Sequence, residues 1–145
     1  MRLLGFLSAR LRFCRDVPPL PHLLDAYLWL HAFLFRRETF AAMEALFEEL
    51  RAWPGVTWHL HRFGGIEWRV GATEIGHLHG NGVLDALLPN REASEREIRA
   101  GRAVEHHTHP RTAWVSLSVR SRADERIATQ LLQLALEAQS RSLER

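Results

Sequence analysis

Lysine is absent from this chain of 145 residues, and cysteine occurs only once, as Cys14. A lone cysteine excludes an intrachain disulfide and is typical of a reducing compartment, so we expect a cytoplasmic protein. The formal charge of +2 is too small to indicate nucleic-acid binding. Because a recognition helix, a basic-aromatic sheet motif and a phosphate-cradling glycine loop are also missing, we expect no nucleic-acid partner.

Long hydrophobic runs are missing as well. The apolar stretch over residues 27–35 is far shorter than the ~20 residues that span a bilayer, and the N-terminus lacks the apolar core of a signal peptide. We expect residues 1–20 to form a basic, apolar helix and a proline-rich linker, and residues 21–145 to form one domain. That helix would also suit a membrane surface, but we expect it to pack on its own domain or on a partner subunit. The oligomeric state stays open.

The pattern of apolar residues predicts an α+β fold. Apolar residues at three- and four-residue spacing indicate helices over 37–52 and 123–139, with more helix after residue 21 and a short helix from Asn90 or Ser94 to Ile98. Short alternating runs between glycine turns indicate an antiparallel sheet of about six strands. The expected strands cover residues 56–62, 66–70, 73–79, 83–88, 103–107 and 113–119. We expect the helices at both chain ends to pack on one face of this sheet.

Turn chemistry suggests how the strands pair. A three-residue loop over 63–65 would place Leu60 opposite Trp68, and a two-residue loop over 71–72 would then place His77 opposite Ile66. This register predicts that His77 and the next-but-one residue, His79, share the apolar face. A three-residue loop over 80–82 would set Asp85 opposite His77, whereas a two-residue Asn-Gly turn would pair Asp85 with Leu78. We favour the first because it gives the histidines a partner.

Five of the nine histidines lie in two short segments, around residues 77–79 and 106–109. Histidine changes charge near neutral pH and binds metals, so this concentration indicates a site. A structural hydrogen-bond network is the simplest alternative, and a metal bound by the His-x-His pair is another. His59 and His61 share a face with Glu67 and Arg69, which is typical of a solvated polar sheet face. His22 and His31 are most simply packing or surface residues.

Several segments resemble fungal luciferases, the enzymes that oxidise 3-hydroxyhispidin with molecular oxygen to give light. Glu74-Ile-Gly-His77-Leu-His79 is similar to their Glu-Ile-Ala-His-Met-His segment, and Glu105-His106 corresponds to their Gln-Arg-His region. Bacterial relatives of unassigned function resemble the chain more closely, through His61-Arg-Phe-Gly-Gly65 and the strand that begins at Trp114. The resemblance covers roughly residues 54–138. It implies a luciferase-like α+β domain and matches Glu74, His77, His79 and His106 to the family motif. Asp85 stands where the fungal chain has a histidine.

These observations lead to one hypothesis about function. We expect a pocket between the sheet and the helices that binds a planar pyrone or phenol, with molecular oxygen as co-substrate and neither a cofactor nor a metal. His77 or His79 would act as general base, His106 would stabilise the oxyanion, and Asp85 would fix the histidine tautomer. The matched Glu74 completes the catalytic set. The substrate-binding candidates are Trp58, Trp68, Trp114 and His107. The alternative is a non-catalytic binding or interaction module with a structural histidine network.

Overall fold

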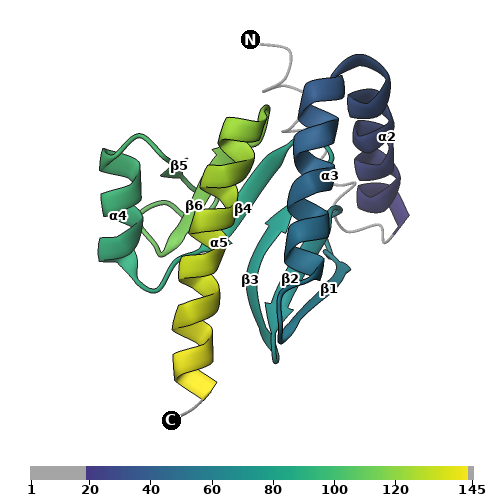
Figure 1. Ribbon diagram of the computed structural model, residues 1–145. Helices are drawn as coiled ribbons and strands as arrows, with labels where there is room; N and C mark the ends of the chain where they lie inside the picture. Colours follow the sequence, from purple (N-terminus) through teal and green to yellow (C-terminus); the bar gives the residue numbers. More distant parts are fainter. Residues whose placement is uncertain (1–18, 144–145) are drawn as a thin grey trace.

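The computed structural model describes residues 19–143 as helices on an antiparallel sheet (Figure 1). The helices are α2 (Pro19–Phe35), α3 (Arg37–Arg51), α4 (Arg91–Arg99) and α5 (Arg122–Leu143). The strands are β1 (Val56–Leu60), β2 (Ile66–Val70), β3 (Thr73–Leu78), β4 (Val83–Leu87), β5 (Val104–Glu105) and β6 (Trp114–Ser118). They form one six-stranded sheet in the order β1-β2-β3-β4-β6-β5, and the predicted α+β class is confirmed.

Helices α3 and α5 lie side by side over one face of the sheet, as predicted, while α4 lies beside β5 and β6 (Figure 1). The core fills the space between this helical layer and the sheet. Trp68 of β2 and Leu78 of β3 are fully buried there, with Leu46 of α3 and Leu132 of α5. Burial of each such side chain contributes about 1.5–3 kcal/mol, so this face holds the fold together.

Helix α2 begins at Pro19, within the segment that we expected to be a linker. Proline is tolerated in the first turn of a helix, because the backbone N–H groups there have no helical partner, and α2 starts with Pro19 and Pro21. The rest of the expected N-terminal helix and linker lies outside the described residues. None of the helices within residues 19–143 has the length and apolar character needed to cross a membrane.

The β1–β2 hairpin keeps the predicted face but not the predicted register. Leu60 pairs with Ile66 rather than with Trp68, because the loop closes one residue earlier, through a 2.9 Å hydrogen bond from the His61 N–H to the Gly65 carbonyl. The shift of two in the pairing leaves every side chain on the same side of the sheet. His61 and Glu67 therefore share a face, as the sequence indicated.

A β-bulge in β3 overturns one prediction about the histidines. The two-residue loop after β2 pairs Arg69 with Glu74, but Trp68 then pairs with Gly76, which leaves Ile75 as an extra residue. His77 consequently lies opposite Glu67, not Ile66. Because the side-chain direction alternates along a strand, this single insertion moves His77 and His79 from the helix-covered face to the opposite face.

The turn between β3 and β4 follows the preferred prediction. His77 pairs with Asp85, and a 2.9 Å hydrogen bond from the His79 N–H to the Val83 carbonyl closes the three-residue Gly80-Asn81-Gly82 loop. On the next strand, β6, Ser116 pairs with Asp85. Neighbouring strands thus carry a row of polar side chains on the face away from α3 and α5.

Candidate functional site

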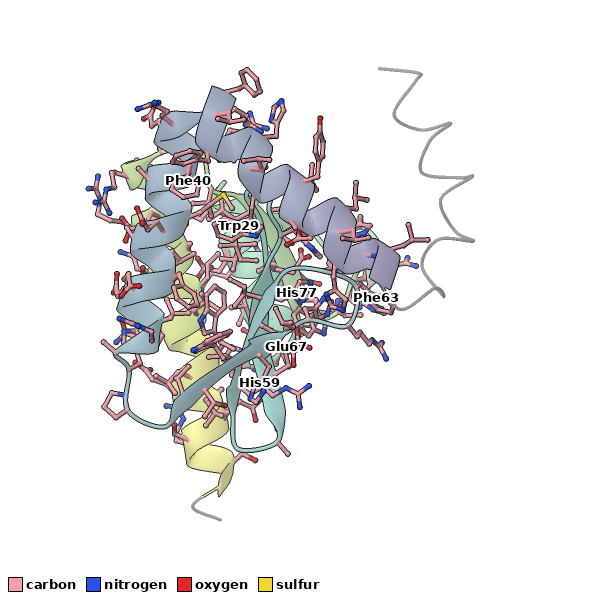
Figure 2. All side chains as sticks on the ribbon, turned by 90° about the vertical axis from the view of Figure 1, so that its right-hand side faces the viewer. Trp29, Phe40, His59, Phe63, Glu67 and His77 are labelled. Carbon is pink, nitrogen blue, oxygen red and sulfur yellow. The ribbon has the colours of Figure 1, made fainter. Side chains whose placement is uncertain are left out.

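A pocket of about 670 Å³ lies on the sheet face that α3 and α5 leave uncovered. Figure 2 shows His77, Glu67 and Phe63 on this side of the sheet, while Trp29 and Phe40 lie toward the helices. The expectation of a pocket between the sheet and the helical layer is therefore wrong, and the bulge in β3 is the physical reason. The pocket is lined by Leu60, His61, Arg62, Phe63, Glu67, Arg69, Glu74, His77, His79, Asp85, His106, His107, Thr108, His109 and Trp114.

His77 occupies the centre of the site between two carboxylates. Its Nδ1 lies 2.5 Å from Oε1 of Glu74, and its Nε2 lies 3.1 Å from Oδ2 of Asp85. Burial by itself would lower the pKa of His77, but the contacts with the two carboxylates raise that pKa from 6.5 to about 9. His77 is consequently an imidazolium at neutral pH, with one ring nitrogen close to each carboxylate and no lone pair left to accept another proton.

Asp85 is the most deeply buried acid of the site. Its Oδ1 accepts a short hydrogen bond from the Ser116 hydroxyl. Its Oδ2 is buried without a well-directed hydrogen bond from any residue within 19–143, although Nε2 of His77 and Nε2 of His106 lie 3.1 and 3.6 Å away. Burial raises the pKa of Asp85, but His77 and Ser116 more than offset this, so the pKa is lowered. Asp85 is a buried carboxylate that holds two histidines around one oxygen.

The backbone of the following turn fixes the tautomer of His106. Nδ1 of His106 accepts hydrogen bonds from the N–H groups of Thr108 (3.2 Å) and His109 (3.1 Å), so this nitrogen must carry the lone pair. Burial lowers the pKa of His106 despite the opposing charge of Asp85. The ring is therefore neutral, with its proton on Nε2, the nitrogen that lies 3.6 Å from Oδ2 of Asp85, and it is an uncharged hydrogen-bond donor.

His61 and His79 lie against the His77 ring and stay neutral. The ring of His61 stacks on that of His77, with centroids 4.0 Å apart, and its Nδ1 lies 3.3 Å from the Gly64 carbonyl, to which it donates. The ring of His79 meets His77 edge-on at 5.0 Å. Burial, reinforced by the charge of His77, lowers the pKa of His61 and lowers that of His79 to about 4. The site thus combines one imidazolium with neutral imidazoles.

Helix α2 holds the β3–β4 turn in place from the edge of the sheet. Asp25 of α2 is buried, accepts a 2.8 Å hydrogen bond from the Gly80 N–H, and lies 3.9 Å from Nδ1 of His79. A Cβ atom on Gly80 would approach the Asp25 carbonyl to 2.6 Å, so only glycine allows the helix this close. The position of His79 therefore depends on α2 as well as on β3.

Two of the three predicted tryptophan walls lie elsewhere. Trp68 is fully buried in the core, and Trp58 packs on Phe47 of α3, so both are on the opposite face of the sheet from the pocket. Trp114 does line the pocket, with its ring centroid 5.7 Å from that of His77 and 5.9 Å from that of His106. Among the other predicted site residues, His107 also lines the pocket.

The expectation that His61 and Glu67 lie on a solvated sheet face is wrong. Both are buried, with exposed fractions of 6% and 4%. Glu67 accepts a 2.5 Å hydrogen bond from Nε of Arg69, which also lines the pocket. His59 on the same face is exposed, as expected. The available signal was Gly76, because an isolated glycine inside a strand often marks a bulge. A bulge there would have placed His77 and His79 on the same sheet face as His61 and Glu67.

Three groups of side chains have ligand atoms within 4.8 Å of one another, as a metal site would require. The group of His61, His77 and His79 includes two stacked rings, whose in-plane lone pairs cannot converge on an ion ~2.0–2.1 Å away. In the group of His77, Asp85 and His106, Nδ1 of His106 accepts N–H donors, whereas a metal-bound histidine donates from its other nitrogen.

The third group consists of His61, Glu67 and Glu74. Each carboxylate in it already has a cation, Arg69 beside Glu67 and His77 beside Glu74, both at 2.5 Å. The negative charges of Glu67 and Glu74 are therefore already balanced by Arg69 and His77. The site as a whole thus places the ion-paired imidazolium of His77 beside neutral imidazoles that can form hydrogen bonds.

The fold and this pocket define the class, an α+β domain with a histidine-lined site on an open sheet face. Residues 72–135 match the model of the family described as the luciferase domain, so this part of the chain is luciferase-like. No curated protein and no solved structure matches the chain. The matched part runs from the start of β3 into α5, and it contains Glu74, His77, His79, Asp85 and His106.

Proposed function

We propose that this domain is an oxidoreductase of the oxygenase type, which binds a planar phenol or hydroxypyrone and oxidises it with molecular oxygen without a cofactor. The observation that carries the proposal is His77, a buried cation beside neutral imidazoles in a pocket large enough for a small molecule. A preorganised N–H donor such as Nε2–H of His106 stabilises a ligand oxyanion without the reorganisation that water would need. The site is thus suited to an enolate or phenolate.

Geometry divides the roles among the histidines. Of the two predicted bases, we assign the proton transfer to His79, because a neutral imidazole has a lone pair and His77 does not. His106 donates its Nε2–H to the substrate oxyanion, and the carboxylates of Glu74 and Asp85 hold the His77 imidazolium in place. Trp114 provides a flat wall against which an aromatic ring can pack.

The reaction then needs only the substrate and oxygen. The hydroxyl O–H bond breaks as its proton moves to His79, leaving an electron-rich enolate. The enolate carbon gives an electron pair to oxygen and forms a C–O bond, which produces a peroxide anion that the protonated His79 can neutralise. Oxygen is the oxidant, and the substrate carbon is oxidised. His106, as a neutral N–H donor, stabilises the negative charge throughout.

Phenol ionisation and oxygen uptake test the proposal. We expect 4-nitrophenol to bind to the full chain mainly as its phenolate, seen by absorbance at a pH where the free probe is protonated. We also expect hydroxypyrones such as 3-hydroxyhispidin to support oxygen consumption. His106→Gln should lower kcat by roughly 10²–10³, the usual effect of losing one oxyanion donor. His59→Gln is the matched control, since His59 is an exposed histidine outside the pocket lining.

The competing function is a non-catalytic binding module with a structural histidine network. It agrees with the internal pairing of His77, whose two nitrogens both face protein carboxylates. It predicts binding of the phenol without oxygen consumption. Unchanged probe ionisation and turnover in both His79→Gln and His106→Gln would remove the catalytic assignment.

A further inference from the structure

Helix α2 presents an unusual amount of apolar surface to solvent. Eight of the eleven large exposed hydrophobic residues within 19–143 lie on this one helix. They are Leu20, Leu23, Leu24, Tyr27, Leu30, Phe33, Leu34 and Phe35. Contiguous apolar patches of this kind are rare on monomers and mark surfaces that bind another molecule.

The exposed residues follow the spacing of a helix–helix seam. Leu20, Leu23, Tyr27, Leu30 and Leu34 recur at alternating intervals of three and four, as the a and d positions of a heptad do, and their exposed fractions run from 38% to 64%. On the other side of the helix, residues such as Asp25 and Ala32 are buried, at 8% and 2%. The helix therefore docks on its own domain through one side and directs the heptad stripe outward.

The charge of α2 helps to decide whether a membrane or a protein surface covers the exposed stripe. Asp25 is the only Asp, Glu, Lys or Arg in α2, and it is turned inward. Helices that lie on anionic membranes carry basic residues on their polar face, and α2 has none. Because the stripe carries no charges, no like-charge repulsion opposes its packing against an identical stripe.

We propose that α2 is a dimerisation helix that packs against α2 of a second copy of this chain about a two-fold axis. In such an interface the same patch is used on both subunits, and Tyr27, at the middle of the stripe, lies closest to its own counterpart. Aromatic side chains offer ~150–250 Å² each. The three aromatic and five leucine side chains, at about half exposure, therefore supply several hundred Å² per chain, the same order as the ~800 Å² that a standard interface buries per partner.

Sedimentation of the full chain over a wide concentration range tests this proposal. We expect a dimer for the natural chain and a monomer for the double variant Leu23→Glu/Leu30→Glu, with the dissociation constant raised at least roughly 30-fold. Both leucines are more than half exposed, so the variant should keep the fold, as checked by circular dichroism and thermal unfolding. Val104→Glu is the matched control, because Val104 is equally exposed but lies on β5, and it should leave the dimer intact.

A cross-linking experiment gives an independent readout. Tyr27→Cys in a Cys14→Ser background should form an intermolecular disulfide under mild oxidation, whereas Val104→Cys in the same background should not. A natural chain that stays monomeric at every concentration would overturn the proposal. So would a dimer that survives in the double variant, or a monomer that instead co-sediments with phosphatidylglycerol vesicles through the same leucines.

Discussion

Raising the pH from 6.5 to about 9 is expected to lower the free energy of unfolding by about 3 kcal/mol through His77 alone. The folded-state pKa of His77 is raised from 6.5 to about 9, and each unit of difference corresponds to about 1.4 kcal/mol. Because the folded pKa is the higher one, this stability is fully present below pH 6.5. It is lost as the pH rises through 9. Urea unfolding at a series of pH values measures the effect.

The substitution His77→Gln should remove this alkaline loss of stability. At neutral pH it should also destabilise the fold by roughly 3–5 kcal/mol, because the carboxylates of Glu74 and Asp85 remain close together without their shared cation. Adding Asp85→Asn to this variant should recover part of the loss. His59→Gln, an exposed histidine on the same face, should keep the full pH dependence. An alkaline limb that is unchanged in His77→Gln would show that His77 is not held as a cation.

Acidification is expected to destabilise the protein for the opposite reason. The folded-state pKa of His79 is lowered from 6.5 to about 4, so between these values the unfolded chain takes up a proton that the folded chain refuses. Stability therefore falls as the pH drops below 6.5, and His79 accounts for about 3 kcal/mol of the loss by pH 4. The lowered pKa values of His61 and His106 act in the same direction.

The variant His79→Gln isolates this acid contribution. Glutamine cannot take up the proton in either state, so the decrease in stability from pH 6.5 to 4 should shrink by about 3 kcal/mol. The loss of stability at alkaline pH that depends on His77 should remain. Unfolding followed by intrinsic fluorescence across this range provides the measurement, with His59→Gln again as the control. If the acid limb were the same with and without His79, the ring would have to be hydrated rather than buried.

Local sequence patterns predicted most of the fold. The helix α3 and the strand β2 begin where periodicity placed them, and Asn90 caps α4 with a 2.9 Å hydrogen bond from the Ala93 N–H. These features depend on neighbouring residues, which the sequence displays directly. The three-residue Gly80-Asn81-Gly82 loop, and with it the pairing of His77 with Asp85, was predictable for the same reason.

The face of the sheet on which the site lies was not predicted, because it depends on the single extra residue Ile75. A sheet without the bulge would place His77 and His79 on the same face as Trp68. The prediction of Trp68 as a pocket wall and the assignment of His61 to a solvated surface both followed from this one error. The contacts from Asp25 to Gly80 and from His106 to Asp85 join segments that are distant in the sequence. No local pattern reports such contacts, although the histidine concentration correctly indicated where to look.

The bulge and the hairpin before it make the pocket a composite of two parts. The family-matched residues 72–135 carry the ion-paired His77 and the donor His106, whereas His61, Glu67 and Arg69 belong to the β1–β2 hairpin that precedes them. A hairpin is a compact unit that can be grafted between related scaffolds. Exchanging it would reshape one wall of the pocket while His77, His79 and His106 stayed in place, which makes this hairpin the part of the pocket to vary when the proposed ligand binding is tested.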